Sequence, residues 1–104
     1  MGRYPRRRPA RLGQKLLQIR YALELSQDGM LSRLGLGEER FRSSVSSYER
    51  GGEPELHILL RYARLAGIPV EVLIDDELDL PKATQRAAKR GAGVGETRRR
   101  RSKS

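Results

Sequence analysis

Apolar residues recur along this chain at the spacing of one face of a helix. The clearest stripe steps by four, three and four residues, through Leu12, Leu16, Ile19 and Leu23. That spacing predicts a first helix over 12–23. A two-residue alternation does not persist anywhere, so we expect no strands. No apolar run approaches the roughly 20 residues that a membrane span needs. The pattern therefore predicts an all-α protein outside the membrane.

Capping and helix-breaking residues divide the following segment into four more helices. Ser26 suits the N-cap of a second helix, and Gly35 suits the left-handed residue that ends it. Two glycines follow the third helix, and Gly67 ends a fourth helix that has a wide apolar face and Pro54 in its first turn. The second helix is expected at 27–34, and the third is expected to end at 49–50. The fourth is expected at 54–66 and the fifth at 70–74.

Charge is distributed unevenly along the chain. Residues 1–11 carry +5 and 82–104 carry +8, whereas 12–81 carry −4, within a net charge of +9. The arms offer too little apolar surface to offset the entropy of ordering, although the start of the second could hold a frayed helical turn or two. Their composition suits phosphate binding, and also a solubilising or localising tail. The expected organisation is a disordered basic arm at 1–11, a folded domain at 12–80 and a disordered basic tail at 81–104.

Two segments carry a resemblance to a known family. LSQDGMLSRLGL at 25–36 and VSSYERG at 45–51 are similar to the helix-turn-helix proteins that include phage repressors and Cro, the XRE-like regulators. The similarity extends over about 12–74. It implies a compact five-helix, lambda-repressor-like domain whose third helix enters the major groove of double-stranded DNA.

The resemblance also implies roles for particular residues. The positions that would contact bases are Arg42, Ser43, Ser46 and Ser47. Arg42 is the sharpest candidate, because one guanidinium can bond both O6 and N7 of guanine. Val45 and Tyr48 are expected in the core.

Four further residues have expected roles, two of them from the resemblance. Gln27 follows the N-cap of the second helix, where backbone amides and the helix dipole favour a phosphate, and Arg50 is expected to contact the backbone. Arg20 and Glu49 correspond to a buried ion pair between the first helix and the end of the third. The loss of one partner from such a pair leaves an unpaired buried charge.

The chain departs from the family pattern in three places. Nine residues lie between Gly35 and Val45, where the family usually has five. Either the third helix extends back to about Glu38, or a longer loop precedes it; we favour the loop, which holds the acidic residues away from phosphate. Glu24 replaces a usual glycine and Leu31 a usual alanine, and both changes imply repacking near the second helix.

The sequence gives little support for an enzyme active site or a metal site. The chain has no cysteine, and its one histidine, His57, has no second ligand at a readable spacing. The acidic residues within 75–79 lack the spacing and glycine of a calcium loop, although they could hold a basic arm against the domain when DNA is absent. We expect no catalytic residues, no metal and no cofactor.

The expected function is sequence-specific binding of double-stranded DNA by a repressor-like transcriptional regulator in the cytoplasm, at the nucleoid. An antitoxin-like or adaptor protein, which acts mainly through protein contacts, is the alternative. Binding of RNA or of any nucleic acid through the arms alone is a third hypothesis. The sequence leaves open whether a second copy of the chain or a toxin is also a partner.

Overall fold

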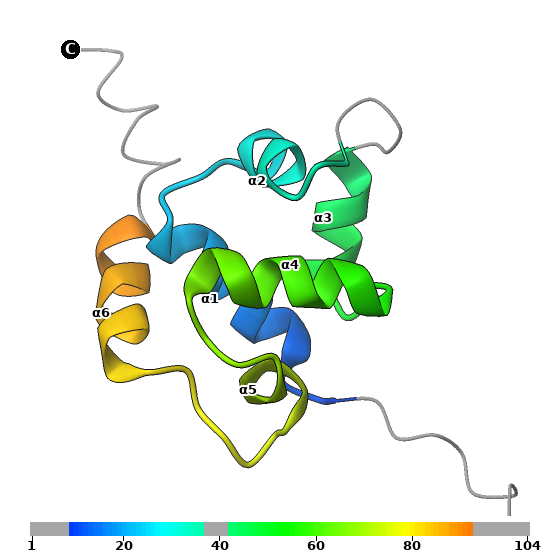
Figure 1. Ribbon diagram of the computed structural model, residues 1–104. Coiled ribbons are helices and arrows are strands. Elements are labelled where there is room, and N and C mark those ends of the chain that lie inside the picture. The colour runs from blue at the N-terminus through cyan, green and yellow to red at the C-terminus, as the bar shows by residue number, and fades with distance from the viewer. Residues whose placement is uncertain (1–8, 37–41, 93–104) are drawn as a thin grey trace, which may run out of the picture.

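The computed structural model describes residues 9–36 and 42–92, and all regular structure in these residues is helical. This confirms the all-α class. The helices are α1 (Leu12–Ala22), α2 (Gln27–Arg33), α3 (Arg42–Glu49), α4 (Leu56–Ala66), α5 (Glu71–Ile74) and α6 (Lys82–Gly91). Helix α1 contacts α3, α4, α5 and α6, and in Figure 1 α3 and α6 lie on opposite sides of it.

Local capping signals set the ends of α2 and α4 as the sequence predicts. The Ser26 hydroxyl accepts a hydrogen bond from the backbone N–H of Gly29 at 3.0 Å, which satisfies an amide at the start of α2. Gly35 and Gly67 follow α2 and α4 in the left-handed conformation, at φ +76° and +71°. Pro54, predicted in the first turn of α4, instead precedes the helix, which begins at Leu56.

One apolar core joins the helices. Val45 and Tyr48 belong to it, as predicted, with exposed fractions of 0% and 8%. Its other fully buried apolar side chains come from α1, α2, α4 and α5 and from the residue that follows α2; they are Leu16, Ile19, Met30, Leu34, Ile58, Tyr62 and Leu73. Because α3 contributes to this shared core, its orientation is fixed relative to α1 and α4.

The sixth helix is the main difference from the sequence prediction. The prediction of five helices and a disordered tail from residue 81 is wrong for Lys82–Gly91, which form α6 and pack along α1. The side of α6 that meets α1 carries small residues at Thr84, Ala87, Ala88 and Gly91. A Cβ on Gly91 would overlap the carbonyl oxygen of Tyr21, so only glycine permits this approach. The folded unit therefore extends past residue 80, through α6.

Glu24, which stands where the XRE-like proteins usually have glycine, has the backbone conformation of a glycine. Glu24 has φ +59°, and among the described residues it alone has positive φ without being glycine. A left-handed backbone costs an ordinary side chain about 1–2 kcal/mol. The turn between α1 and α2 therefore holds local strain.

We expect Glu24→Gly to raise the free energy of unfolding by about 1 kcal/mol, because glycine adopts this conformation without a Cβ penalty. Gly67→Ala is the matched control: it places a Cβ in the same conformation, and apart from its two chain neighbours no residue comes within 4 Å of that Cβ, so only strain is added. It should lower the free energy of unfolding by about 1 kcal/mol. Urea unfolding of both variants tests the argument, and a Glu24→Gly protein less stable than the parent would contradict it.

Candidate nucleic-acid interface

A single carboxylate at the end of α3 links that helix to α1. Arg20 Nε donates to Glu49 Oε2 at 2.6 Å, and Arg20 Nη2 donates to Glu49 Oε1 at 3.1 Å. The side chains of Arg20 and Glu49 are only 12% and 6% exposed. Two parallel charge-assisted hydrogen bonds fix distance and orientation together. The two residues thus meet in the buried pair that the resemblance implies.

The same guanidinium and carboxylate also hold the start of α2. Arg20 Nη1 donates to the carbonyl oxygen of Leu25 at 3.0 Å, and Gln27 Nε2 donates to Glu49 Oε1 at 3.2 Å. The structure thus places the amide of Gln27 against Glu49. A side-chain amide carries two N–H donors, so this hydrogen bond leaves one for another acceptor. The phosphate contact of Gln27 stays a prediction.

Helix α3 has an apolar inner side and a polar outer side. Val45 and Tyr48 point into the core, whereas Ser46 is half-buried and Ser47 is exposed. Exposed Arg50, just past the helix, donates from Nη1 to the Ser46 hydroxyl at 2.7 Å. The structure therefore brings three of the predicted contact residues together at the C-terminal end of α3.

The other two predicted base contacts lie at the start of α3. Arg42 and Ser43 have helical backbone in its first turn, but their side chains lie outside the described part of the chain. Residues 37–41, which bear on the choice between a longer loop and a longer helix, lie outside it as well. Both hypotheses for this segment stay predictions.

A buried tyrosine lies near the Arg20–Glu49 pair. Tyr62 of α4 is fully buried, and its hydroxyl has no hydrogen-bond partner among the described residues. Burial, and then the negative charge of Glu49, raise the pKa of Tyr62 well above its ordinary value. The hydroxyl therefore stays protonated beneath the ion pair.

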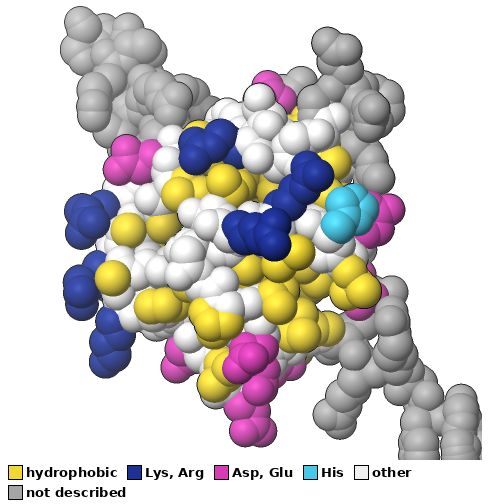
Figure 2. All heavy atoms as spheres, viewed as in Figure 1, with side chains coloured by type: hydrophobic (Ala, Val, Ile, Leu, Met, Phe, Trp, Pro, Cys, Tyr) yellow, Lys and Arg dark blue, Asp and Glu magenta, His cyan; other side chains and the backbone are white. Residues whose placement is uncertain are grey.

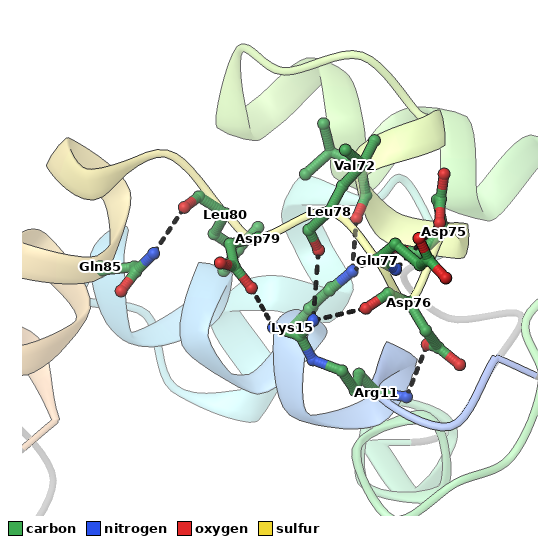
Figure 3. Close-up of polar contacts among 10 residues, drawn as sticks. All are labelled: Arg11, Lys15, Val72, Asp75, Asp76, Glu77, Leu78, Asp79, Leu80 and Gln85. Carbon is green, nitrogen blue, oxygen red and sulfur yellow. Dashed lines mark hydrogen bonds and ion pairs between the residues drawn. The ribbon is translucent and has the colours of Figure 1, made fainter.

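The acidic segment 75–79 holds the end of the N-terminal arm. The Asp76 carboxylate accepts hydrogen bonds from the backbone N–H groups of Ala10 and Arg11 at 2.8 and 3.0 Å. The Arg11 guanidinium pairs with Asp79 at 2.6 Å (Figure 3). These contacts lower the pKa of Asp76, through the two backbone N–H groups, and that of Asp79, through the Arg11 side chain. The carboxylates also lie next to the N-terminus of α1, where negative charge is favourable.

Lys15 reaches from α1 into the same segment from inside the protein. Its Nζ donates to the carbonyl oxygens of Val72 and Asp75 at 2.7 and 2.9 Å, and the side chain is buried (Figure 3). Burial, and then the neighbouring Arg11 charge, lower the pKa of this lysine. Lys15 of α1 and Arg11, the residue just before α1, therefore both hold the segment that follows α5.

Sequence reasoning anticipated one feature near these sites in part and missed another. The acidic segment was expected to be able to hold a basic arm, and the contacts of Arg11 agree with this, but local spacing does not single out Arg11, because its partners lie more than 60 residues away in the sequence. The basic residues of α6 have a readable signal, because Lys82, Arg86 and Lys89 are spaced four and three residues apart. That spacing puts the three on one face of a helix.

Comparison with models of protein families, with curated proteins and with solved structures finds no match to this chain. None of the described helices has the length and apolar character that crossing a membrane requires. Within 9–36 and 42–92, no three histidine, cysteine or acidic side chains are grouped as metal ligands would be.

We expect a double-mutant cycle on Arg20 and Glu49 to show strong coupling in the free energy of unfolding. Either single alanine variant leaves a buried charge without its partner and should cost about 3 kcal/mol, whereas the double variant should cost much less than the sum. The Arg11–Asp79 pair, which is 45% and 68% exposed, is the control, and its coupling should be small and weakened by salt. Additive effects at Arg20 and Glu49 would contradict a buried role.

We expect acid to release Ala10 and Arg11 from the acidic segment. A lowered folded-state pKa contributes stability above the ordinary aspartate value of about 3.9, and this contribution is lost as the pH falls through the lowered value. The amide proton shifts of Ala10 and Arg11 should therefore stay constant from about pH 7 to 5 and change only below about pH 4. Asp76→Ala should abolish this transition, whereas Glu77→Gln should leave it. A midpoint at or above 3.9 would refute the assignment.

Proposed function

We propose that the protein binds double-stranded DNA at specific sequences through α3, with α2 behind it, as a transcriptional regulator of the repressor type. The observation that carries this proposal is the arrangement of α3: a buried ion pair and two core residues hold it, while Ser46, Ser47 and Arg50 face outward. Recognition helices need this combination of a fixed inner side and a polar outer side. The resemblance to XRE-like regulators supports the same function.

Charge on α3 favours approach to DNA. Glu49 is the only acidic residue of this helix, and Arg20 neutralises it. Arg50 has further N–H donors besides the one bound to Ser46, so a phosphate can bind without loss of that contact. Gln27 likewise keeps one amide N–H while the other holds Glu49. The contacts that fix α2 and α3 therefore remain compatible with phosphate binding.

The basic arms would add affinity for phosphates without reading sequence, and no cofactor enters the proposal. With this function the protein would act in the cytoplasm, at the nucleoid. The alternative of an adaptor that binds a partner through the acidic segment is less favoured, because two of its carboxylates hold Ala10 and Arg11.

Selection of bound sites from random duplex DNA by the full chain tests the proposal. We expect one preferred sequence, and we expect Arg42→Ala to cost about 1–3 kcal/mol at one guanine and to relax the preference there. Arg64→Ala is the matched control, because Arg64 is exposed in the last turn of α4, and it should leave the selected sequence unchanged.

Two outcomes would contradict parts of the proposal. A parent protein that selects no sequence would refute specific binding through α3. An Arg42→Ala variant that loses affinity equally for every sequence would instead remove Arg42 from the base contacts.

A further inference from the structure

Helices α1 and α6 enclose a surface groove of about 430 Å³. Its floor includes Leu17 and Tyr21 of α1 and Ala88 of α6. The groove exists because the small residues of α6 let that helix approach α1, as the buried Gly91 shows most clearly. It is thus a product of the folded sixth helix and not of a basic tail.

The two walls of the groove carry different polar groups. Helix α1 contributes the side-chain amides of Gln14 and Gln18, and α6 contributes Lys82, Arg86 and Lys89. None of the described residues that line the groove is acidic. Amide N–H groups, ammonium groups and guanidinium groups are the donors that proteins use toward phosphate oxygens. The chemistry of both walls therefore suits a phosphodiester chain.

The cations of α6 form a row that matches an extended polyanion. Lys82, Arg86 and Lys89 are exposed, and no ion pair with another described residue neutralises them. At 1.5 Å of rise per residue, the row is about 10 Å long, whereas the phosphates of one DNA strand advance about 3.4 Å per step along the axis. Figure 2 shows basic side chains along the edge of the molecule that α6 occupies. The row is long enough to accompany about three consecutive phosphates.

We propose that the α1–α6 groove is a second DNA-contact surface, which binds the phosphodiester backbone of duplex DNA on the opposite side of α1 from α3. The inference rests on the proposed function in its choice of duplex DNA as ligand, but it does not require sequence-specific contacts by α3. The groove adds affinity that is independent of sequence, because its donors bind the phosphates of the backbone and do not contact the edges of the bases.

The three cations should not contribute equally. The negative charge of Asp79 lies close enough to Lys82 for the two charges to interact. The charge of Asp79 therefore weakens the electrostatic attraction between Lys82 and a phosphate. Arg86 and Lys89 are farther along α6, so we expect them to contribute more than Lys82 does.

The test measures binding of the full chain to a 30-base-pair duplex over a range of salt concentrations. Each phosphate contact that is lost should lower the slope of log affinity against log salt by about 0.9. Arg86→Gln should therefore lower the slope by about 0.9, and the triple variant Lys82→Gln, Arg86→Gln, Lys89→Gln by about 2 to 3. Arg64→Gln removes the same type of exposed charge from α4 and should leave the slope unchanged.

A second variant separates a docked groove from a basic tail. Gly91→Ala keeps every charge but forces a Cβ against the Tyr21 carbonyl, which displaces α6 from α1. We expect its affinity for the duplex to fall several-fold, with faster amide hydrogen exchange in α6 as evidence of displacement. Parent affinity in a variant with displaced α6 would overturn the role of the groove.

The remaining outcomes are equally decisive. An unchanged salt slope in the triple variant would overturn the proposal, and so would a loss that affects a single strand of the same length but not the duplex. A parent protein without sequence preference would refute specific binding through α3, yet the difference in slope between the triple variant and Arg64→Gln would still be measurable. The two proposals therefore fail in different ways.

Discussion

The arrangement of α1, α2 and α3 depends on the contacts of the Arg20 guanidinium. It binds both oxygens of Glu49 and also the carbonyl of Leu25, so one planar group sets three segments relative to one another. A lysine could not replace it, because an ammonium lacks the rigid fork that makes two parallel bonds to a carboxylate. These contacts therefore determine how α2 and α3 are placed relative to each other on the surface of the protein.

Helix α1 in turn supports both proposed DNA-contact surfaces. A Cβ on Gly13 would lie 2.8 Å from the Glu49 carbonyl oxygen, and a Cβ on Gly91 would overlap the Tyr21 carbonyl. Close packing on glycine therefore brings α3 to one side of α1 and α6 to another. Since neither neighbour can shift far against such contacts, the spacing between the two surfaces is set by the thickness of one helix.

The features that the sequence predicted are those with local causes. Ser26 and Gly35 bound α2 because capping and left-handed φ depend on neighbours within a turn. The Arg20–Glu49 contact could be anticipated only through the resemblance, since 29 residues separate the two. The docking of α6 could not, because it depends on how the small side chains of one helix fit the backbone of another. Charge alone suggested that the acidic segment could hold a basic arm, but the particular Arg11–Asp76 contacts could not be predicted, because they join segments that only the fold brings together.

The buried position of Lys15 has a consequence for amine chemistry. Among the lysines of the described residues, Lys82 and Lys89 are exposed, whereas Lys15 is 2% exposed and its Nζ is bound to two carbonyl oxygens. An acylating reagent can reach this amine only when the segment after α5 separates from α1. The rate of Lys15 acylation would therefore report local opening of the domain at that place, with the two exposed lysines as internal standards for the reagent.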